Sequence, residues 1–432
     1  MISLRGLVAA SATLLSTAVA TPWSTTPLPP SQDPWYTGPD GYECESPGTV
    51  LRIRQAPGNA TSVVQGAASA WNILYATTDS RYNPSWAVTT VFVPSKTDGT
   101  ALLSYQVAYD TADLDESPSY GLYSGLMDIP FWNTILAQGW ILNIPDYEGL
   151  NASFTAGVMS GHATLDSVRA VLSLKQKFNI ADDVKYAMWG YSGGALATEW
   201  ASELQTQYAP EMNFAGAAFG GLTPNVTSVL VTITGAPFAG LIPSALLGMT
   251  SQFPDARAAL LAELKETGPY NATSFLAAFN YSYIEAGVAF ANQDITAYFR
   301  DGLNGILNPL VQSVINNDCI MGYHGFPTFP LYIYKAIQDE ISPVADTDAL
   351  VDKYCSIGAN ITYDRNTIGG HADEVTNGAL SAFSFLASVL APSKNSTSKS
   401  TSKSTCNSAS TVTPGTNCII RTVSVNITDS GA

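Results

Sequence analysis

The pentapeptide Gly190–Gly194 (GYSGG) constrains the fold of this 432-residue chain more than any other feature. An apolar run at Val184–Trp189 precedes it and predicts a buried strand, and Ala195–Tyr208 follows it with helical periodicity. Glycines relieve the crowding at a tight strand-to-helix turn, so such a turn can expose a serine hydroxyl. The pattern predicts an α/β fold with Ser192 at one edge of its sheet.

Strand-like and helix-like segments alternate on both sides of this turn. Runs rich in Val, Thr, Trp and Tyr predict strands at Ala68–Thr77, Ser85–Pro94, Leu102–Tyr109, Trp140–Pro145, Phe214–Phe219, Phe329–Lys335 and Ile361–Tyr363. Apolar residues at helical spacing predict helices over Ala163–Phe178 and about Val375–Leu390. This alternation is typical of a mostly parallel sheet with helices on both faces.

The alternation stops between about residues 224 and 321. This segment is mainly helical by pattern, with Ala236–Met249 and Gly302–Ile315 as examples. A long helical block placed late in an α/β sheet is expected to form a cap, or lid, over the active face. A separate helical domain is the alternative.

The first twenty residues predict a secretory signal peptide. Arg5 precedes an apolar stretch from Leu7 to Val19, and small residues follow it, so we expect cleavage near Ala20. The apolar stretch is too short to span a bilayer comfortably, and no later segment is apolar for long enough. We therefore expect a secreted, extracellular protein without a transmembrane segment.

The remaining chain divides by composition into three parts. Residues 21–47 are expected to form an extended surface leader, because their first part is rich in Pro, Ser and Thr. Residues 48–392 are expected to form the folded domain. Residues 393–432 form a Ser/Thr-rich tail that becomes β-like near Cys418–Ile427.

Composition excludes several functions. The net charge is −16 with only 19 Lys plus Arg, so a nucleic-acid partner is not expected. No Cys-X-X-Cys pair or histidine cluster suggests zinc, and we expect neither a metal nor an organic cofactor. We expect a monomer.

In a secreted protein, asparagine sequons can carry glycans and cysteines can form disulfides. Glycosylation sequons occur at Asn59, Asn151, Asn225, Asn271, Asn280, Asn360, Asn395 and Asn426, of which some are expected to carry glycans. The cysteines are Cys44, Cys319, Cys355, Cys406 and Cys418, an odd number that cannot all pair internally.

A serine hydroxyl needs a base to take its proton, and histidine is the usual one. In α/β-hydrolases the order along the chain is serine, acid, histidine. His162 precedes Ser192, and His324 precedes the strand expected to carry the acid. His371 follows the strand at Ile361–Tyr363 and precedes the last helix, which makes it the expected base.

The acid is expected between Ser192 and His371, at the end of a strand. Asp339 follows the strand Phe329–Lys335 closely enough to turn towards His371 and hold its tautomer. Glu340 is the alternative, and Asp346 and Asp348 are weaker ones that are more simply solvated loop charges.

These and other motifs together resemble the fungal secretory lipases, the Candida antarctica lipase A-like family of the α/β-hydrolase superfamily. The resemblance runs from about Trp35 to Leu390. It rests on PDGYE at 39–43, SYQ at 104–106, PDYEG at 145–149, SGHA at 160–163, GYSGG at 190–194, DEISPVADTD at 339–348 and Gly370-His371. The family's triad maps onto Ser192, Asp339 and His371.

The resemblance also implies further features. It assigns the oxyanion hole to the amides of Gly193 and Asp110, and it makes the helical block a cap that shapes an acyl tunnel. Relatives often have a cysteine just before the segment matching Pro118-Ser119-Tyr120, and this chain has none there. We therefore expect Cys319 to pair with Cys44, and Cys355 with a tail cysteine.

The expected function is cleavage of carboxylic esters through an acyl-enzyme on Ser192, as in a triacylglycerol lipase that meets its substrate at a lipid–water interface. A carboxylesterase for short-chain or secondary-metabolite esters, or an acyltransferase, is the nearest alternative. A non-catalytic binding protein on a hydrolase scaffold is a further one.

Overall fold

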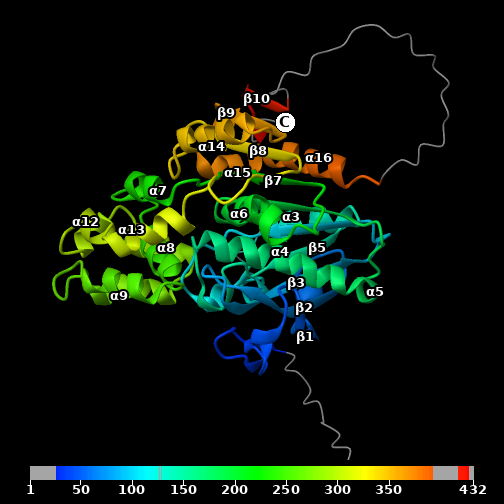
Figure 1. The fold of residues 1–432 in the computed structure, drawn as a ribbon, viewed down its shortest axis with the longest axis horizontal. Helices are drawn as coiled ribbons and strands as arrows, with labels where there is room; N and C mark the ends of the chain where they lie inside the picture. Colours follow the sequence, from blue (N-terminus) through cyan, green and yellow to red (C-terminus); the bar gives the residue numbers. More distant parts are fainter. Residues whose placement is uncertain (1–25, 126, 128, 393–416, 428–432) are drawn as a thin grey trace, which may run out of the picture.

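The computed structural model describes residues 26–125, 127, 129–392 and 417–427 (Figure 1). Their strands form a ten-stranded sheet in the order β1-β2-β3-β5-β4-β6-β7-β8-β9-β10. The strands are β1 Val50–Gln55, β2 Ala67–Thr78, β3 Pro84–Pro94, β4 Ala101–Gln106, β5 Ile141–Pro145, β6 Lys185–Tyr191, β7 Gly216–Gly220, β8 Leu331–Ala336, β9 Ile361–Asn366 and β10 Cys418–Val423.

The sheet is antiparallel from β1 to β5 and parallel from β5 to β10. In the parallel part, register brings strand ends together: Gln106 pairs with Gly190, and Ala336 pairs with Asn366. The carboxyl ends of β4, β6, β7, β8 and β9 therefore lie at one edge of the sheet, where binding sites of α/β folds are found.

Helices cover both faces of this sheet and bury two apolar layers. On one face, α4 (Gly157–Ser173), α6 (Gly193–Tyr208) and α14 (Val344–Ser356) contribute to the larger layer. On the other, α3 (Ile129–Ala137) and α16 (Ala379–Leu390) pack against the sheet. The fold is that of an α/β-hydrolase, with a mostly parallel central sheet as the alternation predicts.

Residues 224–321 form a helical insertion between β7 and β8, with an apolar core of its own (Figure 1). Its helices are α7 Val226–Ile233, α8 Leu241–Thr250, α9 Pro254–Ala262, α10 Ala272–Leu276, α11 Tyr283–Phe290, α12 Leu303–Ile306 and α13 Pro309–Asp318. The two ends of the insertion meet in a bridge between Asn225 and Ile320. The amide of Met321 also donates to the Pro224 carbonyl at 3.0 Å.

The remaining helices are short: α1 Ala60–Val63, α2 Pro118–Gly121, α5 Lys175–Phe178 and α15 His371–Asn377. No helix in the described parts of the chain has the length and apolar character needed to cross a bilayer.

The leader is not simply extended on the surface, and that expectation is wrong for its described part. Trp35 is 1% exposed and packs with Leu74 and Val88. The Arg54 guanidinium lies 4.1 Å from the centre of the Trp35 ring and pairs with Asp33 at 2.6 Å. Burial of an indole ring and this cation–π contact fix the leader to β1, β2 and β3.

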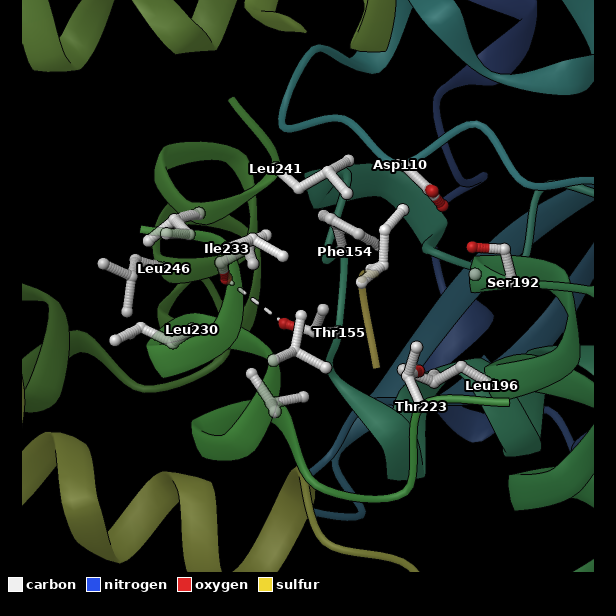
Figure 2. Close-up of a pocket in the computed structure, with 16 residues that line it drawn as sticks. Asp110, Phe154, Thr155, Ser192, Leu196, Thr223, Leu230, Ile233, Leu241 and Leu246 are labelled. Atoms are coloured by element: carbon white, nitrogen blue, oxygen red, sulfur yellow. Dashed lines mark hydrogen bonds between the residues drawn. The ribbon is translucent and has the colours of Figure 1, made fainter. Parts of the chain in front are cut away.

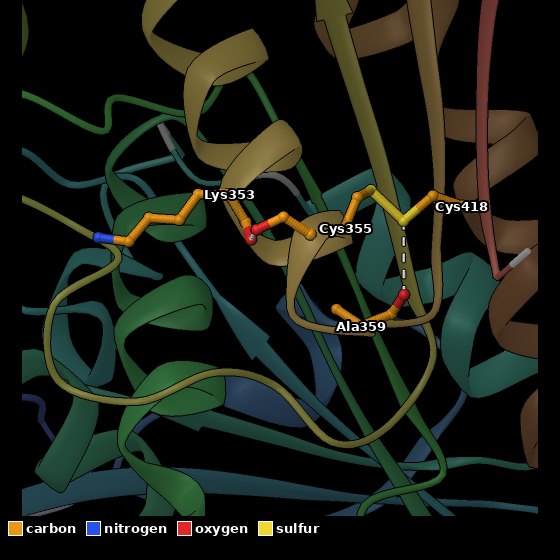
Figure 3. The surroundings of a disulfide bond; sticks show 5 residues. Lys353, Cys355, Ala359 and Cys418 are labelled. Atoms are coloured by element: carbon orange, nitrogen blue, oxygen red, sulfur yellow. Dashed lines mark hydrogen bonds between the residues drawn. A yellow bond between two sulfur atoms is a disulfide. The ribbon is translucent and has the colours of Figure 1, made fainter. Parts of the chain in front are cut away.

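The tail contributes the last strand of the sheet. β10 pairs in parallel with β9, and a disulfide joins Cys418 to Cys355 at the end of α14, with a Cα–Cα distance of 5.9 Å (Figure 3). The expected bond between Cys355 and a tail cysteine is confirmed. The folded domain therefore extends beyond the expected boundary at residue 392, and Cys406 lies outside the described residues.

The expected bond between Cys44 and Cys319 is wrong, since both are free thiols. Cys44 is exposed in the leader. Cys319 is buried at the end of the helical insertion, where its Sγ lies 3.6 Å from the Met249 Sδ. The two cysteines belong to different parts of the fold, and sequence position did not reveal this.

The sequons differ in accessibility. Asn59, Asn151, Asn280 and Asn360 are exposed, Asn225, Asn271 and Asn426 are half-buried, and Asn395 lies outside the described residues. The exposed four stay the better predictions for glycosylation.

Candidate active site

Ser192 lies at the turn from β6 to α6, as the motif predicts. Its backbone has φ 54° and ψ −119°, a conformation that L-residues rarely adopt and that costs roughly 1–3 kcal/mol. The amide of Ser192 donates to the Gly220 carbonyl at 2.9 Å, which ties the turn to the end of β7. The strained backbone is thus at the residue whose side chain projects from the sheet edge.

Two glycines allow the turn to be this tight. A Cβ on Gly190 would lie 2.1 Å from the Gly194 carbonyl oxygen, and one on Gly194 would lie 2.0 Å from the Gln106 carbonyl oxygen. Both distances are far below van der Waals contact with a backbone atom. The glycines are therefore required for α6 to start against β6 and β4.

The structure brings Ser192, His371 and Asp339 into one hydrogen-bonded row. The Nε2 of His371 lies 2.9 Å from the Ser192 Oγ, and its Nδ1 lies 2.7 Å from the Asp339 Oδ2. His371 is the first residue of α15, and Asp339 follows β8. In this arrangement Asp339 can hold the tautomer in which Nε2 accepts the serine proton.

Four donors surround the carboxylate of Asp339. The amides of Ile341 and Ser342 donate to Oδ1 at 2.9 and 2.8 Å, and Oδ2 accepts from His371 and from the Lys335 Nζ at 2.9 Å. Burial alone would raise the pKa of Asp339, but the His371 hydrogen bond and the Lys335 charge outweigh it and hold the pKa below its usual range. Asp339 is therefore ionised at neutral pH.

None of the alternative acids bonds the His371 ring. Glu340 accepts from the backbone amide of His371 at 2.7 Å, so it supports the loop and not the ring. Asp348 pairs with Arg365 at 3.0 Å. Asp346 lies in the first turn of α14.

The other two histidines lie away from Ser192. His162 is buried and stacks on Tyr208 with ring centres 3.7 Å apart, and burial lowers its pKa to about 3. His324 follows the helical insertion, 3.6 Å from the Glu203 carboxylate. Both placements agree with their exclusion on chain order.

The residues expected to form the oxyanion hole lie beside Ser192. Asp110 and Gly193 line the same pocket as Ser192, and a Cβ on Gly193 would lie 1.9 Å from the Asp110 Oδ1. Asp110 has a positive φ of 47°. Burial raises the pKa of its carboxyl to about 7, and Oδ1 has no hydrogen-bond partner among the described residues.

An apolar pocket runs from Ser192 into the helical insertion (Figure 2). Leu196 and Thr223 lie near Ser192, and Leu230, Ile233 and Leu246 line the far end. The other lining residues are Asp110, Phe154, Thr155, Gly193, Val226, Val229, Leu241, Ile242, Ala245 and Ile341. The cavity has a volume of about 50 Å³.

Three contributions were missed by sequence reasoning. Lys335 is fully buried beside Asp339, and the Tyr191 hydroxyl donates to the His371 carbonyl at 2.5 Å. At the end of β9, the Asn366 side-chain amide donates to the Val425 carbonyl of the tail at 2.9 Å. A lysine inside the otherwise apolar strand Leu331–Ala336 was the one available signal.

Comparison with known proteins agrees with this geometry. The family model described as Secretory lipase matches residues 123–397. The chain belongs to the secretory lipase family. Its relatives are lipases and esterases, and the chain is a carboxylic ester hydrolase.

Individual relatives divide into esterases and lipases. The chain is 50% identical to the Trichothecene C-3 esterase of Fusarium sporotrichioides over 85% of each chain. It is 35% identical to Lipase A of Arthroderma benhamiae over 83% of this chain and 79% of that one. The closed-state structure of Candida antarctica lipase A superposes with a TM-score of 0.76 at 29% identity, covering 85% of this chain and 87% of that one.

Proposed function

We propose that this secretory lipase family member is a serine esterase that releases short acyl groups from a bulky alcohol. The observation that carries the proposal is the row Ser192–His371–Asp339 at the mouth of a small apolar pocket. The row supplies a nucleophile and a base, and the pocket sets the size of the acyl group.

The reaction divides into acylation and deacylation. His371 takes the proton of Ser192 as the Oγ attacks the ester carbonyl, and the amides of Gly193 and Asp110 stabilise the negative oxygen. His371 then gives its proton to the departing alcohol. Water, deprotonated by His371, attacks the acyl-enzyme and releases the acid, while Asp339 stays ionised throughout.

The pocket volume favours a short acyl group. The space open to the centre of a water-sized group is only about 50 Å³, so the pocket is narrow. We expect this pocket to accept an acetyl or butyryl chain more readily than a palmitoyl chain. The lining is apolar apart from a few groups near Ser192, so binding of the chain is driven by burial.

The names of two relatives suggest which alcohol forms the other half of the ester substrate. The Trichothecene C-3 esterase is 50% identical to this chain, and a probable trichothecene esterase of Stachybotrys chartarum is 42% identical. The lipases at 32–35% identity are less similar. We therefore propose a trichothecene, esterified at C-3, as the first substrate to test.

A triacylglycerol lipase is the second candidate. Exposed apolar side chains on the helical insertion favour it, among them Val231 at 55% and Val288 at 79% exposed. Such residues would contact a lipid surface, and a shift of the insertion there would open the pocket to longer chains.

A series of p-nitrophenyl esters from acetyl to palmitoyl separates the two candidates. We expect kcat/KM to peak at acetyl or butyryl for the esterase, and to rise with chain length for the lipase. The Ser192→Ala variant should lose at least about 10⁴-fold in kcat. Ser384→Ala, on the exposed side of α16, is the matched control and should retain full activity.

Substantial activity in folded Ser192→Ala protein would refute the nucleophile. A trichothecene C-3 ester and an emulsified triacylglycerol, compared at equal concentrations, then test the alcohol. Faster turnover of the emulsion would replace the esterase proposal with the lipase.

Secretion is the second part of the proposal. The family is a secretory one, and residues 1–20 have the composition of a signal peptide, although they lie outside the described residues. We expect N-terminal sequencing of protein from culture medium to begin near Thr21. A first residue within 1–15, or retention inside the cell, would contradict it.

A further inference from the structure

Lys335 is a charged residue that contacts the proposed triad and has no part in the reaction as described. Its side chain and that of Asp339 are both 0% exposed, and the Nζ–Oδ2 distance is 2.9 Å. The ammonium group also donates to the Leu222 carbonyl at 2.7 Å. A buried lysine is costly unless it is paired, so its position here calls for a role.

The ammonium and the imidazole share a single carboxylate oxygen. The Oδ2 of Asp339 accepts from the Lys335 Nζ and from the His371 Nδ1, and both backbone amides go to Oδ1. When His371 takes up a proton, its new charge must lie beside the charge of Lys335. A like charge bound to the same oxygen disfavours the protonated imidazole. A carboxylate that bound the imidazole alone would stabilise it.

We propose that Lys335 is a positioning residue that divides the charge of Asp339 and so keeps His371 unprotonated in more acidic solution than the Asp–His pair alone would allow. The proposal rests on the proposed function, because it takes His371 to be the base. Its consequence is a hydrolase whose base remains available at lower pH.

Lys335 must be protonated for this to hold. Burial lowers the pKa of Lys335, and the charge of Asp339 acts in the opposite direction. Two acceptors, a carboxylate and a carbonyl, receive its protons in the structure. An ammonium group satisfies both acceptors better than a neutral amine.

Other charged groups also face His371, and they are the same in each variant below. Glu340 binds the His371 amide, and Asp373 and Glu374 lie on α15 with it. Tyr191 binds its carbonyl from the end of β6, and Asp110 faces Ser192 across the pocket. A difference between wild type and a Lys335 variant is therefore assigned to Lys335.

The chain has only three histidines, so a titration followed by NMR on histidine-labelled protein resolves each ring. His162, with a pKa of about 3, should not titrate above pH 4. We expect Lys335→Met and Lys335→Gln to raise the titration midpoint of His371 by about one to two pH units. The acid limb of kcat/KM should move by the same amount.

Lys185→Met is the matched control. Lys185 is another strand lysine that donates to a backbone carbonyl, that of Ala391 at 2.6 Å, but it begins β6 whereas Ser192 follows the end of that strand. Its loss should leave the midpoint of His371 unchanged. A general effect of removing one positive charge would shift both variants alike and would overturn the proposal.

Lys335 could instead matter only for stability. In that case the Lys335 variants would melt earlier with an unchanged midpoint, and the proposal would be wrong. If neither variant folds, Lys335→Arg, which keeps the charge beside Asp339, should leave the midpoint of His371 as in the wild type, and a shift in that variant would overturn the proposal. The titration requires no catalysis, so its failure is distinct from failure of the ester hydrolase proposal.

Discussion

The sheet edge and the helical insertion contribute to the same site through different interactions. At the edge, Ser192, His371 and Asp339 are fixed by directional hydrogen bonds of 2.7–2.9 Å and by backbone amides. In the insertion, α7 and α8 contribute apolar side chains that define a volume and make few directional contacts. We therefore expect that substitutions at the edge change the catalytic rate, and that substitutions in the insertion change the size of the accepted substrate.

The largest expected effect lies at the edge. Asp339→Asn should reduce kcat about 10⁴-fold, because an amide at this position favours the wrong tautomer of His371. Glu340→Gln is the matched variant, since Glu340 bonds the backbone amide of His371 and not its ring. It should cost less than about tenfold. Similar losses in both variants, measured by steady-state kinetics on folded protein, would reopen the choice of acid.

The second prediction concerns the tail strand that supports the edge. Replacing both Cys355 and Cys418 by Ser should lower the free energy of unfolding by about 2–4 kcal/mol, because the bond closes a long loop, with a sequence separation of 63. We also expect a severalfold loss of kcat, since β10 and Val425 after it hold Asn366, the last residue of β9, from which the chain continues to His371. Chemical denaturation and kinetics measure both.

Cys44→Ser is the control for the tail variants, because Cys44 is an exposed free thiol. It should change stability by less than about 0.5 kcal/mol. If the double variant unfolded at the wild-type denaturant concentration, the Cys355–Cys418 bond would contribute nothing to stability.

The third prediction tests the insertion. Leu246→Ala enlarges the far end of the pocket and should raise the ratio of octanoyl to butyryl hydrolysis about tenfold, since each buried methylene contributes roughly 0.8 kcal/mol. Leu260→Ala removes a buried leucine from the same apolar core without lining the pocket. It should destabilise the protein and leave the ratio unchanged. An equal shift in both would mean that pocket size does not decide chain length.

The smallest effect involves acids in both regions. Burial raises the pKa of Asp110 at the edge and of Asp318 at the end of α13 to about 7. Between pH 4 and 7 the folded chain then binds protons that the unfolded chain has lost, so stability falls as pH rises through this window. We expect Tm to fall by at least about 5 °C from pH 5 to pH 8.

Asp318→Asn should reduce that fall, because its carboxyl no longer titrates and only Oδ1 has a partner, the Val158 amide at 2.8 Å. A Tm that rises from pH 5 to pH 8 in the wild type would contradict the raised pKa values. Differential scanning calorimetry at four pH values is sufficient.

The parts of the fold that sequence predicted best are those with local signals. The strand, turn and helix around Ser192 share one short window, and each has its own periodicity or glycine requirement. The position of His371 followed from chain order and from the helix after it. The leader was harder, because the burial of Trp35 depends on Arg54, Leu74 and Val88, which are distant in sequence.

By itself, the sequence determined a strand–turn–helix with an exposed serine, an alternating α/β order and a helical insertion, because these depend on local periodicity and on glycine. Only the tertiary structure decided that Asp339 and not Glu340 meets the His371 ring, that Lys335 shares its oxygen, and that Cys355 bonds Cys418. The pocket volume was also a tertiary result. Distances between residues far apart in the chain depend on tertiary packing, which local sequence patterns do not determine.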